Sequence, residues 1–123
     1  MEPRGLALTL DARVIMETDK FIRALRLWAG DKPFIRRVFI FGSRAKNTYT
    51  EDSDLDIAIE FEKFENDSNH LATWITESGA WKKELEALIP AIKIDLQWHD
   101  PSGSTKTIDK GIKDGSIKIY EKL

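Results

Sequence analysis

The chain has 123 residues, of which 41% are apolar, enough for one compact domain with a hydrophobic core. Its 19 basic and 21 acidic side chains nearly cancel to a net charge of −2, so no overall basic field indicates a nucleic-acid partner. It has no cysteine, no secretory-type leader and no apolar run long enough to cross a bilayer. We therefore expect a cytoplasmic protein that forms a single domain over residues 1–123.

The first half of the chain predicts one helix followed by two strands. Apolar residues recur at three- and four-residue spacing over residues 10–29, and Gly30 ends this predicted helix. A β-branched and aromatic run predicts a strand over residues 36–41, which ends at Gly42 as a buried strand entering a turn would. Over residues 53–61 apolar and polar side chains alternate, and this alternation predicts a strand with one buried face.

The second half predicts a helix, a strand and a short closing unit. Residues 71–89 keep helical spacing up to Pro90, and we expect one helix broken near Gly79 or two short ones. A third alternating run predicts a strand over residues 92–98. A loop, a short helix and an edge strand follow at residues 100–104, 105–114 and 117–120. Strands interleaved with helices predict an α/β or α+β domain around a small sheet.

The acidic residues are unevenly distributed although the total charge is balanced. Eight of them lie within seventeen positions: Glu51, Asp52, Asp54, Asp56, Glu60, Glu62, Glu65 and Asp67. Such a patch attracts cations, and it repels phosphate groups unless a metal ion lies between them.

Asp54 and Asp56 are the first candidate functional residues. Residues at i and i+2 of a strand project from the same face, with Cα atoms about 6.5 to 7 Å apart, so the two carboxylates can converge on one cation. Two metal ions about 3.5 to 4 Å apart are the usual device for displacement at phosphorus, and two or three carboxylates hold them. Asp95, on the polar face of the strand predicted at 92–98, is a candidate for the third carboxylate.

Gly42 and Ser43 are candidates for the opposite half of such a site. A glycine at the end of a buried strand lets the backbone turn sharply and approach phosphate oxygens, with backbone N–H groups and the Ser43 hydroxyl as donors. Arg44 and Lys46 follow closely, and each either contacts a triphosphate or only solvates the surface.

Each of these patterns also has a purely structural explanation. A lone D-x-D is more often a solvated strand end or a turn than a metal site, and a Gly-Ser pair alone is a loop. Any alternating strand exposes polar residues, so Asp95 by itself is equally compatible with both interpretations. Two arguments favour a site: the combined match arises by chance in about one chain in a thousand of this length, and like charges on one strand face repel each other without a cation.

The aromatic and histidine residues have simpler interpretations. Trp28, Trp74, Trp81 and Trp98 occupy apolar-face positions, so we expect core packing rather than base stacking. Tyr120 is expected to pack near the end of the chain. His70 and His99 lack metal-ligand spacing, and we expect surface or capping roles for both rather than catalysis.

At these residues the chain resembles the minimal nucleotidyltransferases of the polymerase β-like superfamily. The family pattern is a strand ending in F-G-S-R-A, then a D-x-D ten residues after the Gly-Ser pair, and a single aspartate on a later strand. This chain has Phe41-Gly42-Ser43-Arg44-Ala45, Asp54-Leu55-Asp56 and Asp95. Residues 112–121 also resemble the family's C-terminal signature, so the similarity runs from about residue 36 to the end.

The resemblance implies a polymerase β-like fold, a small mixed β-sheet flanked by helices, in a single nucleotidyltransferase domain. It implies a nucleoside triphosphate held by Gly42, Ser43 and Arg44. The implied ligands of two Mg²⁺ ions, for which Mn²⁺ can substitute, are Asp54, Asp56 and Asp95. The implied reaction transfers a nucleoside monophosphate, AMP from ATP, to an acceptor hydroxyl with release of pyrophosphate, and Asp95 can also act as the base.

The resemblance also implies a partner. Many small members of the family are similar to the antitoxin of a toxin–antitoxin pair, which adenylylates a tyrosine of a helical HEPN-type toxin. Two alternatives remain open: an antitoxin that binds and masks its partner without catalysis, and a nucleotidyltransferase acting on a small molecule such as an aminoglycoside. Asn47 replaces a glycine of the family pattern, and residues 61–90 match no family motif. We expect acceptor specificity to lie in residues 61–90.

Overall fold

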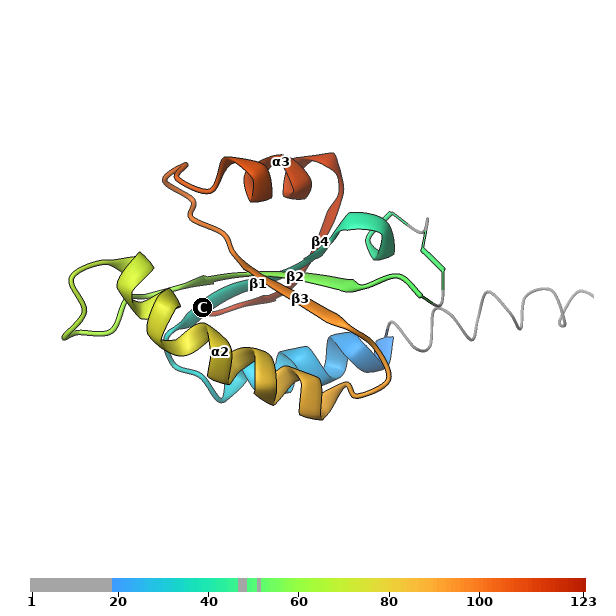
Figure 1. Cartoon of the computed structure of the whole chain (residues 1–123), viewed down its shortest axis with the longest axis horizontal. Coiled ribbons are helices and arrows are strands. Elements are labelled where there is room, and N and C mark those ends of the chain that lie inside the picture. The colour runs from blue at the N-terminus through green and yellow to red at the C-terminus, as the bar shows by residue number, and fades with distance from the viewer. Residues whose placement is uncertain (1–18, 47–48, 51) are drawn as a thin grey trace, which may run out of the picture.

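The computed structural model describes residues 19–46, 49–50 and 52–123, which form a mixed sheet with helices on both faces (Figure 1). Part of the helix predicted at 10–29, and Asn47, lie outside these residues; residues 19–30 are helical. The further elements are β1 (Ile35–Phe41), the 3-10 turn η1 (Gly42–Arg44), β2 (Leu55–Phe61), α2 (His70–Leu88), β3 (Ile94–Trp98), α3 (Lys106–Asp114) and β4 (Ser116–Glu121). The predicted order of elements is therefore confirmed.

The sheet has the strand order β3-β2-β1-β4. β1 pairs antiparallel with both β2 and β4, whereas β2 and β3 are parallel and are joined through α2. This arrangement confirms the small mixed sheet, and it confirms β4 as an edge strand. Helical residues 19–30 and α2 cover one face of the sheet, and α3 lies over the other face (Figure 1).

The hydrophobic core lies between the sheet and the helical layer of residues 19–30 and α2. Its fully buried members include Leu25, Ile40, Ile57, Ile59, Leu85 and Ile94. Trp28 and Trp81 belong to this core as predicted, whereas Trp74 and Trp98 are only partly buried at its margin. Among the described residues, no helix is both long enough and apolar enough to span a membrane.

β2 differs from its prediction because both of its faces are buried. The alternation predicted one solvated face, yet Ala58 is fully buried and Glu60 is only 5% exposed on that face. The reason is that α3 covers this side of the sheet, so β2 is the inner strand of a three-layer arrangement (Figure 1). A polar residue on this face therefore lies inside the protein and needs a partner.

α2 also differs from its prediction, because it is one continuous helix through Gly79. The helix begins where the Asn69 side chain accepts a hydrogen bond from the Ala72 N–H, at 2.9 Å. Trp81 and Leu85 bury their side chains against the sheet after Gly79 and so hold the second half of the helix in line with the first. Nothing approaches the Cα of Gly79 within contact distance on the side where a Cβ would lie, so this glycine is a tolerated surface residue.

Gly79→Ala should stabilise the protein by about 1 kcal/mol, because alanine is the better helix former and its methyl group meets open space. Thermal unfolding should show a rise in Tm of roughly 3 to 6 °C. Gly115→Ala is the contrasting control. Gly115 has φ +155°, and a Cβ built on it would lie 2.9 Å from Lys46 Cγ, so the Tm of this variant should fall. A fall in Tm for Gly79→Ala would mean that the helix is interrupted there.

Candidate active site

The sheet register brings Asp56 and Asp95 together. In the parallel pair of β2 with β3, Asp56 lies directly opposite Asp95, and in the antiparallel pair of β1 with β2, Phe41 lies opposite Asp56. The end of β1 and the beginnings of β2 and β3 therefore meet at one end of the sheet. Asp54 lies just before β2, close enough for its charge to act on Asp56. Two of the three predicted carboxylates are thus direct neighbours and the third is near.

The Asp56 carboxyl group is held in an environment that disfavours its charge. Burial, the negative charge of Asp95, a hydrogen bond to the Asp95 carboxylate and the charge of Asp54 together raise the pKa of Asp56 from 3.8 to about 6. Burial is the largest of these causes. A cation placed between the carboxylates would offset both the repulsion and the loss of hydration.

Gly42 is required by the position of the Asp56 carboxylate. Its backbone has φ +72°, and a Cβ built on it would lie 2.1 Å from Asp56 Oδ2. No side chain fits in that space, and an L-residue also disfavours this backbone conformation. The loop that begins at Gly42 is consequently packed directly against the acidic pair, as expected for a loop that brings phosphate oxygens to carboxylate-bound cations.

The carboxylates present suit a hard divalent cation. In the part of the chain that the structure describes, no three acidic or histidine side chains converge on a single point. Mg²⁺ in nucleotide enzymes is commonly held by one or two carboxylates together with substrate phosphates and water, and Asp56 with Asp95 offers this number. The donor set therefore fits Mg²⁺ in company with a triphosphate, and the assignment of Asp54, Asp56 and Asp95 as ligands stays a prediction.

Arg44 is directed into the protein. It is only 5% exposed, its guanidinium donates from Nε and Nη2 to the Ser53 carbonyl oxygen at 3.3 and 3.2 Å, and it lies over the Tyr49 ring at 4.5 Å. These contacts tie η1 to the segment that leads into β2. The structure supports a positioning role for Arg44, and its predicted contact with nucleotide stays a prediction, as does that of Ser43.

Helix α3 supports the Gly42 loop from the other side. The Cβ position of Gly111 lies 3.0 Å from the Phe41 ring, and that of Gly115 lies 2.9 Å from Lys46 Cγ. A Cβ at either position would crowd these side chains, so the Phe41 ring or the Lys46 stem would have to shift. Lys46 is exposed while its stem packs on Gly115, so its ammonium group is available on the outer side of the loop.

His99 belongs to an ion network that the sequence did not reveal. Its Nδ1 lies 2.8 Å from Glu60 Oε2 and its Nε2 lies 3.0 Å from Asp109 Oδ1, while Arg37 Nη1 donates to Glu60 Oε1 at 2.7 Å. The predicted surface or capping role of His99 is therefore wrong, because its side chain is only 15% exposed and connects β2 to α3. Period-two alternation places His99 on the face of Asp95, but nothing in the sequence indicates α3 above it.

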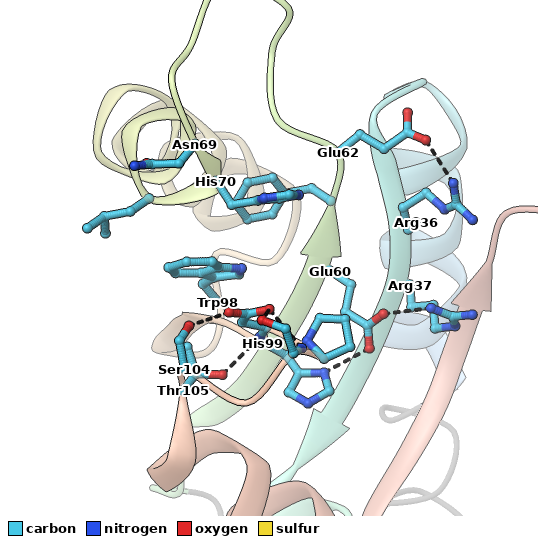
Figure 2. A pocket seen from close by; sticks show the side chains of 15 residues that line it. Arg36, Arg37, Glu60, Glu62, Asn69, His70, Trp98, His99, Ser104 and Thr105 are labelled. Carbon is cyan, nitrogen blue, oxygen red and sulfur yellow. Dashed lines mark hydrogen bonds and ion pairs between the residues drawn. The ribbon is translucent and has the colours of Figure 1, made fainter.

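A cavity of about 830 Å³ lies at the opposite end of the sheet from Asp56. Figure 2 shows Glu60 between Arg37 and His99 in its floor, with His70 and Trp98 on one wall. Glu60 is four residues beyond Asp56 on β2, about 13 Å away at the ordinary strand rise. This cavity and the carboxylate pair are thus separate features of the same sheet.

Comparison with known proteins identifies the family to which the chain belongs. A family model described as "Nucleotidyltransferase domain" matches residues 19–119 of the chain. This match covers both the Gly42-Ser43 loop and the three aspartates in their order. The chain therefore belongs to the nucleotidyltransferase domain family. A search of curated proteins gives no significant match.

Solved structures with a similar fold include two toxin–antitoxin complexes. One, a toxin–antitoxin with AMP-PNP, is 18% identical with a TM-score of 0.53, over 85% of this chain and 73% of that chain. A second, an MntA-HpeT mutant with two aspartates two positions apart replaced by glutamate, is 16% identical with the same TM-score and coverage. A candidate nucleotidyltransferase from Sulfolobus solfataricus is 18% identical with a TM-score of 0.51, over 89% of this chain and 84% of that chain. The chain shares the fold of these proteins.

Asp56→Asn should stabilise the metal-free protein at alkaline pH. Because the pKa of Asp56 is raised when the protein folds, the ionised carboxylate opposes folding above about pH 6, and this penalty disappears as the pH falls toward 3.8. We expect the variant to gain roughly 3 °C in Tm at pH 8, or about 1 kcal/mol, and to gain little at pH 4.5. Asp52→Asn, at an exposed position, is the control and should change Tm little at either pH. A lower Tm for Asp56→Asn than for the wild type at pH 8 would contradict the raised pKa of Asp56.

Gly42→Ala should displace the Asp56 carboxylate and weaken binding of Mg-ATP at least tenfold. The added methyl group occupies the space of Asp56 Oδ2 in addition to straining the backbone. Gly103→Ala is the matched control, since Gly103 has φ +103° but no atom near its Cβ position, so it carries strain without the clash. Calorimetric titration of both variants with Mg-ATP separates the effect of backbone strain from that of the clash with Asp56. Equal weakening of Mg-ATP binding in both variants would show that the contact with Asp56 is unimportant.

Proposed function

We propose that the protein is a metal-dependent nucleotidyltransferase that transfers AMP from ATP to a hydroxyl acceptor. The observation that carries the proposal is the Asp56 carboxylate, packed against Gly42 on one side and paired with Asp95 on the other. Burying two like charges beside each other destabilises a fold, so their presence is explained if a cation and a triphosphate complete the site. Membership of the nucleotidyltransferase domain family supports the same conclusion.

The residues of the chain have distinct proposed roles in this reaction. The Gly42-Ser43 loop offers backbone N–H groups and a hydroxyl to the triphosphate. Asp54, Asp56 and Asp95 hold the Mg²⁺ ions, which supply the charge that offsets the phosphate oxygens. Asp95 accepts the proton of the acceptor hydroxyl, whose oxygen bonds to the α-phosphorus as the bond to the bridging oxygen of pyrophosphate breaks. Lys46, which is exposed beside the loop, would offset the negative charge of the departing pyrophosphate.

We further infer that the acceptor is a tyrosine of a helical HEPN-type toxin, so that the protein acts as an antitoxin. The support is the fold shared with two toxin–antitoxin proteins, one solved with AMP-PNP. In the second of these, the two altered aspartates have the same spacing as Asp54 and Asp56.

A masking antitoxin without catalysis is the second candidate. It is favoured by one observation: three acidic side chains do not converge to a ready-made metal site within the described residues. In this case the carboxylate pair is a remnant, and protection from the toxin depends on surface contact alone.

Thermal shift with Mg²⁺ or Mn²⁺ and each of the four nucleoside triphosphates tests the proposal. Ligand at about a hundred times its Kd stabilises the folded state by about 2.7 kcal/mol, so ATP with metal should raise Tm of the wild type by several degrees. Asp56→Ala should abolish this shift, whereas the exposed control Asp52→Ala should retain it.

Two outcomes would oppose the catalytic proposal. If no triphosphate shifts the wild type even with Mn²⁺, the nucleotide site is rejected and masking becomes the leading function. If nucleotide binds but the double variant Asp54→Ala, Asp56→Ala still protects cells from the toxin, binding rather than AMP transfer provides the protection.

A further inference from the structure

β3 is an edge strand with unused hydrogen-bonding groups. β2 lies on one side of it, and no strand in the described part of the chain lies on the other. The Leu55 N–H donates to the Lys93 carbonyl and the His99 N–H donates to the Ile59 carbonyl, at 2.8 and 2.9 Å. Odd-numbered residues of this segment therefore bond toward β2. By alternation, the N–H and C=O groups of Ile94, Leu96 and Trp98 point away from β2.

An open groove of about 460 Å³ runs beside this edge. Gln97 and Trp98 both line it, and because adjacent strand residues project to opposite faces, the groove lies beyond the edge rather than on one face. Leu71 and Trp74 of α2 form one wall, and residues 104–108 form the other. Figure 1 shows β3 between α2 on one side and α3 on the other, the two elements that bound this groove.

The groove is connected to the candidate base through Gln97. Gln97 lines the groove, and its Nε2 donates to Asp95 Oδ1 at 2.8 Å. A group seated next to Gln97 is therefore one side chain away from the carboxylate that faces Asp56. The large cavity beside Glu60 offers no such continuity, because its lining contains neither Asp95 nor Gln97.

The backbone groups along the β3 edge of the groove are suited to binding an extended polypeptide. The outward N–H and C=O groups lie on alternate residues of β3, about 6.5 to 7 Å apart. The backbone N–H and C=O groups on one side of a second strand have roughly the same spacing, so they can pair with those of β3. A helix has no free backbone groups to pair with them along its length, and a nucleotide does not repeat them. The wall of Leu71, which is 49% exposed, and Trp74 offers an apolar surface for alternate side chains of such a strand.

We propose that the acceptor is an extended polypeptide segment that adds to β3 as a further strand. Its hydroxyl side chain projects to the face of Asp95, and a neighbouring apolar side chain packs between Leu71 and Trp74. This inference rests on the proposed nucleotidyl transfer and specifies the class and conformation of its acceptor. In a helical partner, the segment is a loop or tail outside the helices.

The test uses short peptides with a central tyrosine and randomised flanks, incubated with the full chain, Mg²⁺ and ATP labelled at the α-phosphate. Transfer to peptides should be detected, and N-methylation of alternate backbone amides beside the tyrosine should reduce it about tenfold or more, because each strand hydrogen bond contributes about 1 kcal/mol. Thr107→Trp, which fills the groove from α3, should lower peptide labelling similarly. Lys110→Trp, exposed on α3 outside the groove, should label peptides as the wild type does.

Three outcomes overturn the proposal. Equal labelling of methylated and unmethylated peptides means that side chains alone are recognised. Labelling unchanged by Thr107→Trp means that the groove is not used. If Mg-ATP raises Tm of the chain but no peptide is labelled, an extended polypeptide is not the acceptor. Absence of the Mg-ATP shift in Tm identifies a different failure, that of the nucleotide site itself.

Discussion

The contact between Gly42 and the Asp56 carboxylate is the constraint on which the candidate site depends. The carboxylate oxygen occupies the space where any side chain at position 42 would begin, so loop and acid are held against each other without an intervening group. This arrangement raises the pKa of Asp56, with burial as the main cause, and so opposes folding in the absence of a cation. A site that destabilises its own fold when empty gains stability when its ligands bind, which links occupancy of the site to the stability of the whole domain.

A network of polar side chains at the other end of the same face holds α3 against the sheet. Glu60 contacts Arg37 and His99, and His99 contacts Asp109, so β1, β2 and α3 are joined through side chains that are largely withdrawn from solvent. Once α3 is held there, its glycines pack on Phe41 and Lys46 and support the loop from above. The polar face of the sheet thus has two parts: one in which the Asp56 and Asp95 carboxylates lie beside each other, and one in which the Glu60 carboxylate has Arg37 and His99 as partners.

The strand order gives the acidic pair access to the surface. Because β3 is at the edge, Asp95 lies on the outermost strand while Asp56 lies one strand further in, and the edge groove is lined by Gln97, which bonds to Asp95. A catalytic carboxylate on an inner strand alone would need a channel for its acceptor. In the function proposed above, the β3 edge, which no strand of the described residues covers, offers the acceptor both an approach and a set of directional hydrogen-bonding groups. Residues 61–90, in which acceptor specificity was expected, contribute one wall of that groove through Leu71 and Trp74.

The sequence by itself determined the features that depend on local spacing. A β-branched and aromatic run located β1, period-two alternation located β2 and β3 and placed Asp56 and Asp95 on polar strand faces, and the resemblance carried by the Gly-Ser and D-x-D motifs indicated the nucleotidyltransferase class. Only the tertiary structure decided that Asp56 lies opposite Asp95, that Glu60 is buried, that α2 continues through Gly79 and that Arg44 turns inward. Those outcomes depend on contacts between segments far apart in the chain, such as α3 over β2 and Trp81 against the sheet. Local propensity and periodicity carry no information about which distant segment covers a face, and that covering decides burial, partners and charge.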